Sequence, residues 1–170
     1  SFIEHVISDT SDDVYTVYAS DIDSDGDMDV LSASGDGDKI AWYENDGNQS
    51  FTEKIISSSV DYGRDVYAAD VDGDGDMDAL SASSKNDKIS WHENDGNESF
   101  TEHTISSSAN FARAVFSVDM DFDEDMDILS ASRDDDKIAW YENDGSESFT
   151  LHVISDSADN AISVYAVDMD

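Results

Sequence analysis

Residues 21–29 read Asp21-Ile22-Asp23-Ser24-Asp25-Gly26-Asp27-Met28-Asp29, and this acidic segment determines how the rest of the chain is interpreted. The pattern starts at residues 21, 70, 119 and 168, a constant step of 49. Trp42, Trp91 and Trp140 keep the same step. A fixed period of this length is typical of a repeat protein, in which each unit buries its faces against the next one.

Each acidic segment has the composition of a calcium-binding loop, because alternating carboxylates in a tight turn direct several oxygens onto one hard cation. We expect side-chain ligands at positions one, three, five and nine of each loop, and a backbone carbonyl with water at position seven. The residues concerned are Asp21, Asp23, Asp25, Asp27 and Asp29 in loop 21–29; Asp70, Asp72, Asp74, Asp76 and Asp78 in loop 70–78; and Asp119, Asp121, Asp123, Asp125 and Asp127 in loop 119–127. Asp168 and Asp170 start a truncated fourth loop, 168–170, which cannot hold an ion unaided.

Two other interpretations of these loops are weaker. An EF-hand needs flanking helices and a Glu at loop position 12, where this chain has Ser32, Ser81 and Ser130. A solvated acidic hairpin without an ion is the second alternative. We expect a structural ion that fixes the turn between two strands, with an affinity of about 10⁻⁴–10⁻³ M.

The third loop departs from the pattern at Glu124, where the first two loops have Gly26 and Gly75. Glycine adopts a left-handed turn without steric cost, whereas a side chain there costs roughly 1 kcal/mol. The third site is therefore expected to be weaker, or reshaped by the additional carboxylate.

The second repeat contains four strand-like segments, at residues 65–69, 77–83, 88–93 and 100–105. They are short, rich in β-branched and aromatic residues, and bounded by turn residues. Asn94-Asp95-Gly96 between the last two predicts a hairpin, because Asp-Gly tolerates positive φ. Ile40 and Trp42 fall on one face of a strand, and Ala41 and Tyr43 fall on the other. A strand that is apolar on both faces is expected to lie between two neighbouring layers.

These patterns predict an all-β fold built from β-propeller blades of four antiparallel strands each, with a repeat of 49 residues. Residues 1–170 form one array, in which 1–20 supply the outer strand of a preceding blade and the inner strand of the first. The prediction is three full blades plus an orphan strand at each end, 2–7 and 163–167. Since propellers have typically 4–8 blades, further blades or other copies of the chain are expected partners.

Charge and composition exclude several classes of partner. The chain has 42 acidic against 8 basic residues, a formal net charge of −34, so binding to nucleic acid is not expected. Cysteine is absent, which excludes disulfides and thiolate metal sites. No apolar run is long enough to cross a membrane, and no signal peptide opens the sequence.

The chain resembles the FG-GAP/VCBS repeat family, the repeat type of integrin α-subunit propellers and of many secreted microbial proteins. The resemblance is carried by the acidic loops, by Leu-Ser-Ala-Ser at residues 31, 80 and 129, and by Trp-Tyr-Glu-Asn-Asp-Gly at residues 42 and 140. It implies a calcium-binding β-propeller, usually extracellular or at the cell surface. Such repeats serve adhesion, protein recognition or support of attached domains far more often than catalysis.

Other recurring residues are given structural roles. We expect Trp42, Trp91 and Trp140 to pack between blades rather than to form a sugar-stacking platform. We expect the recurring lysines 39, 88 and 137 to pair with nearby carboxylates. His5, His103 and His152 share a repeat position with Lys54, and His92 shares one with Tyr43 and Tyr141, so these positions are interpreted as tolerant surface sites. Asn48 and Asn97 lie in glycosylation sequons, a signal that matters only in a eukaryotic secreted protein.

The sequence therefore predicts a non-enzymatic, extracellular calcium-binding module for adhesion, protein–protein interaction or structural self-assembly. A calcium-dependent lectin that binds an extracellular glycan is one alternative. An accessory or partial domain of a secreted polysaccharide-active enzyme is another, although blades this alike offer no asymmetric catalytic constellation.

Overall fold

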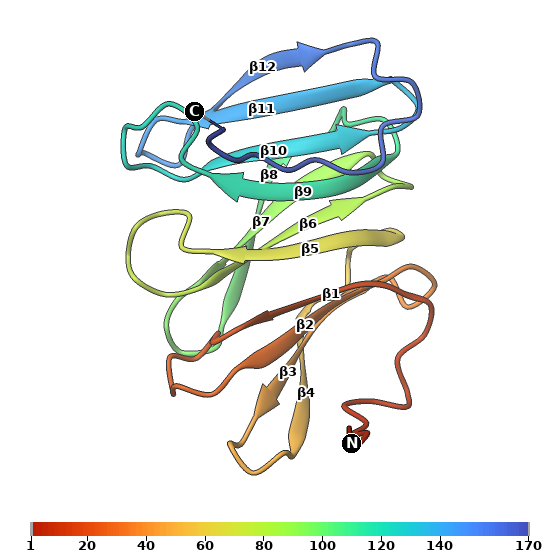
Figure 1. Cartoon of the computed structure of the whole chain (residues 1–170), viewed down its shortest axis with the longest axis vertical. Coiled ribbons are helices and arrows are strands. Elements are labelled where there is room, and N and C mark those ends of the chain that lie inside the picture. Colours follow the sequence, from red (N-terminus) through yellow and green to blue (C-terminus); the bar gives the residue numbers. More distant parts are fainter. Residues whose placement is uncertain (1, 170) are drawn as a thin grey trace.

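The chain folds into three four-stranded antiparallel sheets, as seen in a computed structural model that describes residues 2–169 (Figure 1). Each sheet is a simple meander in which strands follow one another in sequence order. The first comprises β1 (Val14–Ser20), β2 (Asp29–Ser34), β3 (Lys39–Asn45) and β4 (Phe51–Ser57). The second comprises β5 (Gly63–Ala69), β6 (Asp78–Ser83), β7 (Lys88–Asn94) and β8 (Phe100–Ser106). The third comprises β9 (Ala112–Val118), β10 (Asp127–Ser132), β11 (Lys137–Asn143) and β12 (Phe149–Ser155).

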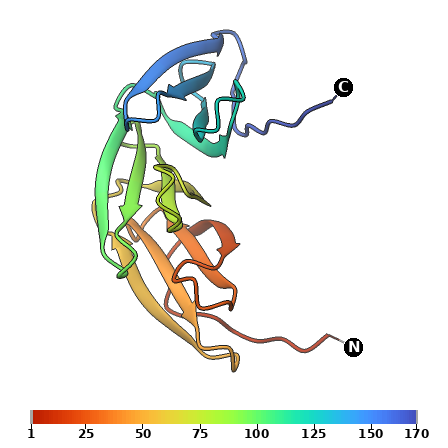
Figure 2. The ribbon, with the colours of Figure 1, turned by 90° about the vertical axis from the view of Figure 1, so that its left-hand side faces the viewer.

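The sheets stack face to face as successive blades along a gentle curve (Figure 2). The inner strands lie side by side at the concave edge, where β5 contacts both β1 and β9. Bonds between blades join them: the Thr16 hydroxyl donates to the Arg64 carbonyl, and the Val115 N–H donates to the Asp65 carboxylate, both at 3.0 Å. This arrangement is the partial propeller-like repeat fold that the sequence predicts.

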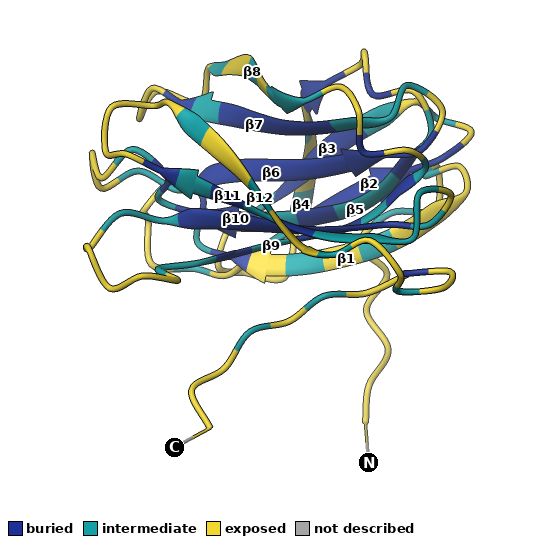
Figure 3. Cartoon of the chain, turned by 90° about the horizontal axis from the view of Figure 1, so that it is seen from above, coloured by how far each residue is buried: buried dark blue, intermediate teal, exposed yellow. Residues whose placement is uncertain are grey.

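The hydrophobic core lies between blades, which explains why the strands are apolar on both faces (Figure 3). Trp42 and Trp91 are each only 1% exposed and belong to the two largest clusters. The Trp42 ring meets Phe100 of the next blade edge-on, with the ring centroids 6.4 Å apart. Trp140, on the last blade, is half-buried. The predicted packing between blades is therefore confirmed for Trp42 and Trp91, whereas Trp140 has no described blade beyond it.

The two terminal segments differ from the prediction. Residues 2–7 and 163–167 form no strand, because neither segment has a strand beside it to exchange backbone hydrogen bonds. The C-terminal segment nevertheless packs against the third blade. Ala161 is buried against Ala114 and Ala131, and the Tyr165 ring lies 4.9 Å from that of Phe116. Segment 163–169 thus runs beside the third blade without extending a sheet.

An aromatic row connects the inner strands at one position of each repeat. It consists of Tyr18, Tyr67, Phe116 and Tyr165, whose successive ring centroids are 4.5, 5.0 and 4.9 Å apart. The rings are tilted rather than stacked, an arrangement that favours edge-to-face contacts. The row fixes the spacing of the blades along the concave edge.

Candidate metal centres

Three groups of carboxylates lie at equivalent places, one at the loop between the first two strands of each blade. In each group, positions one, three and nine of the loop place an oxygen within 4.8 Å of the other two. The groups are Asp21, Asp23 and Asp29; Asp70, Asp72 and Asp78; and Asp119, Asp121 and Asp127. Three carboxylates this close together form a donor set suited to a hard divalent cation.

Position nine is the anchor of each loop and opens the second strand of its blade. Asp78 is fully buried, and its two oxygens accept the Val71 N–H at 3.0 Å and the Asn94 N–H at 2.7 Å. Asp29 and Asp127 repeat both contacts in their own blades. The carboxylate therefore ties the start of the loop to the turn after the third strand.

Position one of the first loop contributes an oxygen that has no hydrogen-bond partner, whereas both oxygens of Asp70 and Asp119 accept backbone N–H groups of their loops. Asp21 Oδ2 accepts the Gly26 N–H at 3.1 Å, while Asp21 Oδ1 is buried and unpartnered. A buried carboxylate oxygen without a donor is costly, and a bound cation would satisfy it. The residues present thus fit a calcium ion, which would draw the carboxylates together and hold the loop closed.

Positions five and seven turn their side chains elsewhere. Asp25 Oδ1 accepts the Asp27 N–H at 2.8 Å, and Asp25 is not among the grouped carboxylates. The Asp27 carboxylate lies so close to the backbone of Gly47 that a Cβ there would collide with it. The structure therefore does not bring the position-five side chain to the predicted site, and position seven has only its backbone carbonyl to offer. Asp168 lies in the described C-terminal segment, whereas Asp170 lies outside the described residues.

The electrostatics of the groups favour a bound cation. Burial, with a smaller contribution from the neighbouring Asp72 carboxylate, raises the pKa of Asp78 to about 6 against the two N–H donors that it accepts from. Burial also raises the pKa values of Asp23 and Asp72, against the backbone N–H that each one accepts, and adjacent carboxylates raise them further. These acids are costly to ionise side by side, and a cation would remove that cost.

The third loop keeps the backbone of the others despite Glu124. Its φ is +79°, against +96° for Gly26 and +98° for Gly75, so the expected left-handed conformation is confirmed. Position four of the loop is left-handed as well, at Ser24, Gly73 and Phe122. The sequence pattern did not reveal this second position, because only one of its three residues is glycine.

The Asn-Asp-Gly turns connect the metal loops of neighbouring blades. Asn94 Nδ2 donates to Met77 O in its own loop at 3.1 Å and to Ile22 O of the preceding loop at 3.2 Å. Asn143 makes the same pair of bonds, to Met126 O and Val71 O. The hairpin turns of the second and third blades therefore each join two loops, a role that their turn chemistry alone did not predict.

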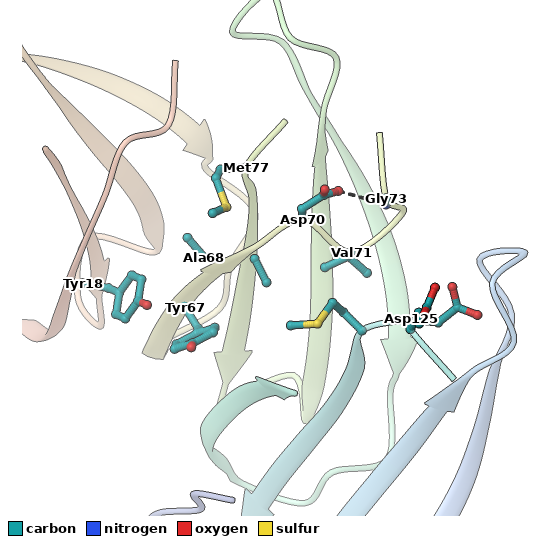
Figure 4. Close-up of a pocket in the computed structure, with 11 residues that line it drawn as sticks. Tyr18, Tyr67, Ala68, Asp70, Val71, Gly73, Met77 and Asp125 are labelled. Atoms are coloured by element: carbon teal, nitrogen blue, oxygen red, sulfur yellow. Dashed lines mark hydrogen bonds between the residues drawn. The ribbon is translucent and has the colours of Figure 1, made fainter. Parts of the chain in front are cut away.

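A pocket of about 470 Å³ opens beside the second loop, between the blades (Figure 4). Tyr18 and Tyr67 lie next to each other at one side, and Asp70 and Asp125 lie toward the other. Met77 is among the apolar side chains that line the space between them. Aromatic faces, thioethers and carboxylates next to a candidate metal loop make this pocket a possible place for a ligand.

A further acidic group consists of Asp23, Glu44 and Glu98 and spans the first two blades. The Lys54 ammonium bonds Glu44 at 3.0 Å and Glu98 at 2.5 Å. The lysine therefore already compensates part of the negative charge of this acidic group.

The recurring lysines pair as predicted. Lys39 bonds Glu53, and Lys88 bonds Glu102. Lys137 bonds Asp135 at 2.6 Å, because Leu151 occupies the place of the glutamate in the third blade.

The position shared by Lys54, His103 and His152 is not merely tolerant. His103 stacks on Trp91 with the ring centroids 4.6 Å apart and bonds Glu93 at 2.7 Å. His152 repeats both contacts, and Lys54 lies over Trp42 at 4.6 Å. Each of these side chains covers a tryptophan and pairs with a carboxylate. His5 lies in the N-terminal segment outside the blades.

His92 contradicts the prediction of a surface site. It is 1% exposed, and its Nε2 lies 2.9 Å from Ser81 Oγ. Burial lowers its pKa to about 4, so it is a neutral core residue near pH 7. The exchange with Tyr at this position reflects two aromatic rings of similar shape between blades, not exposure.

Comparison with known proteins agrees with this architecture. The family model described as an FG-GAP-like repeat matches residues 21–81, 70–130 and 119–170. The chain belongs to the FG-GAP-like repeat family. Each match begins at the first aspartate of a metal loop, so the FG-GAP unit overlaps the boundary between blades. No curated protein matches the sequence.

The FG-GAP array also has a likeness among solved structures. A lectin from Agrocybe aegerita, described for specific recognition of non-reducing terminal N-acetylglucosamine, matches with a TM-score of 0.59 and 16% identity. The match covers 83% of this chain and 39% of the lectin chain, so the array spans about two fifths of that protein. At 16% identity, the similarity between the two proteins shows a shared fold and nothing more. Within residues 2–169, no helix has the length and apolar character needed to cross a membrane.

Proposed function

We propose that this FG-GAP array is a non-enzymatic, extracellular module whose blades are stabilised by calcium. Its role would be adhesion, protein recognition or structural assembly. The main support is the threefold recurrence of three grouped carboxylates, together with the buried, unpartnered Asp21 oxygen. A bound cation accounts for a buried oxygen of this kind better than an ion-free hairpin does. FG-GAP repeats are typical of extracellular proteins, which is where millimolar calcium would fill sites of modest affinity.

The non-catalytic part of the proposal rests on the likeness of the blades. Equivalent positions carry equivalent side chains, whereas an active site needs different groups that converge in distinct roles. The blade histidines already have structural partners: His92 meets Ser81, and His103 and His152 each pair with a glutamate.

Calcium titration of the folded chain, followed by thermal unfolding, tests the metal sites. We expect calcium to raise Tm, since an ion at 100 times its Kd adds roughly 2.7 kcal/mol per site. Asp72→Asn should remove the contribution of the second site. Asp76→Asn changes the charge equally, but its side chain lies against Gly96 outside the group, so the calcium effect should persist. A Tm that does not respond to calcium, or equal losses in both variants, would contradict the proposal.

Sedimentation in millimolar calcium and in excess chelator tests the assembly role separately. Calcium-dependent oligomers would support self-assembly, while a calcium-loaded monomer would restrict the proposal to recognition of other molecules.

Glycan binding is a second candidate, favoured by the pocket beside the second loop. Tyr18 and Tyr67 present aromatic side chains to a space of about 470 Å³ next to Asp70. The lectin from Agrocybe aegerita shares the fold, and N-acetylglucosamine is therefore the first probe. Calorimetric titration of the calcium-loaded chain, with Tyr67→Ala as the comparison, would detect such binding. No heat from N-acetylglucosamine or other neutral and acidic sugars would exclude this candidate.

A further inference from the structure

Half of the basic residues gather at one place in this acidic protein. Arg64, Lys85, Arg113 and Arg133, four of its 8 bases, surround Tyr15, Tyr62 and Phe111. We call these seven residues the cation–aromatic cluster. It lies where β5 and β9 begin and where β6 and β10 end, which is the end of the blades opposite the metal loops (right-hand side of Figure 1).

The cations of the cluster lie over aromatic rings. The Arg64 guanidinium carbon is 4.0 Å from the Tyr15 centroid and 4.5 Å from that of Tyr62. Arg133 lies 3.6 Å from the Phe111 centroid, and the Lys85 ammonium lies 4.3 Å from that of Tyr62. Ring faces attract cations, so these contacts hold the side chains in place without neutralising their charge.

Carboxylates neutralise the other bases but largely spare this cluster. Within residues 2–169, Lys39, Lys54, Lys88 and Lys137 each pair with an acid. In the cluster only Arg133 does so, with Asp134 at 2.6 Å. Burial lowers the pKa of the Arg113 guanidinium, and the charges of Arg64 and Arg133 lower it further. Asp13 approaches the cluster through a 3.3 Å bond from the Tyr62 hydroxyl. Three of the four bases in the cluster therefore have no ion pair among the described residues, while the Asp38 and Asp87 carboxylates bond the Tyr62 and Phe111 N–H groups beside them.

The backbone is bent in a way that creates the cluster. Tyr15, Arg64 and Arg113 occupy the same repeat position, and each is the extra residue of a β-bulge in its inner strand. A bulge re-aims a side chain out of the regular alternation of a strand. Here it brings one ring and two guanidinium groups of successive blades together.

Two aromatic residues of the cluster also have a strained backbone conformation. Tyr62 and Phe111 have φ of +61° and +56°, a left-handed conformation that bulky residues rarely adopt. The equivalent positions in the outer copies carry Asp13 and Asn160, residue types that tolerate this backbone. Aromatic rings thus replace the favoured residues only where the cations gather. Left-handed non-glycine residues also occur in other turns of the chain, Phe122 among them, so this strain supports a ligand site only together with the gathered cations.

We propose that the cation–aromatic cluster binds an oxyanion group, a carboxylate or a sulfate, carried by a small or otherwise neutral ligand. Guanidinium groups recognise such groups through paired N–H donors. A long polyanion is disfavoured, because the remaining surface is strongly negative and would repel it. The site is separate from the metal loops and does not depend on the function proposed above.

The test exploits the fact that the chain has three arginines, all in the cluster. Their Nε–Hε signals are followed by ¹⁵N–¹H NMR of the calcium-loaded chain during titration with sodium sulfate or sodium glucuronate. Sodium chloride at matched ionic strength is the reference. We expect saturable shifts with at least one oxyanion, and a dissociation constant about 10-fold weaker in Arg64→Gln. Lys54→Gln also removes one positive charge, but at a lysine that pairs with Glu44 and Glu98 outside the cluster. This variant should therefore bind the oxyanion with the affinity of the parent chain.

Folding of each variant is checked by far-ultraviolet circular dichroism and by the emission of the buried tryptophans. If Arg64→Gln does not fold, Arg113→Gln replaces it, because its single contact with Phe111 is longer, at 5.9 Å. A response to sulfate alone or to glucuronate alone supports the site and identifies the preferred group. The proposal is overturned if chloride shifts the signals as much as both oxyanions do. It is also overturned if Lys54→Gln weakens binding as much as the arginine variant.

Discussion

Position six of each metal loop has a left-handed backbone, but the residue at this position differs between the loops. Gly26 and Gly75 adopt it freely, whereas Glu124 adopts it with a side chain. A Cβ on Gly75 would meet nothing within 4 Å, so the obstacle at this position is conformational rather than steric. The difference between the loops can therefore be measured as a backbone effect.

We expect Glu124→Gly to stabilise the protein by about 1 kcal/mol, because it removes the strain of the left-handed side chain. Chemical denaturation at fixed calcium measures the change. Gly75→Glu is the matched reverse substitution and should destabilise by a similar amount. Equal stability of both variants and the parent chain would mean that the loop relaxes around either residue.

Single residues were predictable where the repeat itself carries the signal. The aspartates at positions one, three and nine came together as their alternation suggested, and Glu124 took the expected φ. The prediction that His92 lies at the surface was wrong, because the sequence gives no sign that a polar side chain inside a blade is buried. The Asp25 side chain bonds its own loop backbone, an alternative that spacing alone does not reveal.

At the scale of an element, the hairpin turn after the third strand does more than reverse the chain. In the second and third blades its asparagine reaches two loops, one in its own blade and one in the preceding blade. In the first blade, Asn45 Nδ2 reaches Met28 O at 3.0 Å, and among the described residues no blade precedes it. The same turn thus occurs with and without the contact between blades.

Asn94→Ala should cost more stability than Asn45→Ala, by about 1 kcal/mol, because it leaves the buried Ile22 carbonyl without its donor. Urea denaturation of both variants at saturating calcium gives the comparison. Asn45→Ala controls for the loss of the turn itself. If the two substitutions cost the same, the bond between blades contributes nothing measurable.

The elements themselves were predictable to within about two residues, because turn residues bound each short strand. In the second blade, the expected segment 65–69 became Gly63–Ala69, and 88–93 became Lys88–Asn94. The prediction of strands at residues 2–7 and 163–167 was wrong, because strand-forming residues do not make a strand without a neighbouring backbone to bond.

Over the whole molecule, the metal-free state should depend on pH in the direction set by its buried acids. The pKa of Asp78 is raised to about 6, and the pKa values of Asp65 and Asp72 are raised as well, mainly by burial. The native state then binds more protons than the unfolded chain between about pH 4 and pH 6, so stability falls as pH rises through this window. His92, with a pKa near 4, opposes this trend between about pH 4 and 6.5.

In His92→Tyr, which carries the residue of the other two blades and removes the opposing contribution, Tm without calcium should therefore be higher near about pH 5 than near about pH 7.5. Calcium should reverse this order because protons and metal compete for the same oxygens. Thermal unfolding of metal-stripped and calcium-loaded protein at both values is the measurement. Asp78→Asn should flatten the pH dependence of the stripped protein, whatever its own stability. A metal-free His92→Tyr variant that is more stable at the higher pH would contradict this account.

The stacking of blades was predictable from the 49-residue period and the two-sided apolar strands. The cation–aromatic cluster was not, because it depends on how the repeats differ rather than on what they share. Arg64 stands where Tyr15 stands in the first copy, and Tyr62 where Asp13 stands. Averaging the repeats into one pattern hides such differences, and only the stacking of blades brings them to one place.

Each blade is a meander of consecutive strands that contacts only the blades beside it, and this has a mechanical consequence. Pulled from its two ends, such a chain is not expected to rupture as one body, because within residues 2–169 no strand pairing connects one blade to another. It should lengthen in steps, each releasing one 49-residue unit, or roughly 160–175 Å of extended chain. An ion in each loop would set the force of a step, so the molecule would behave as a short series of calcium-dependent extensible links.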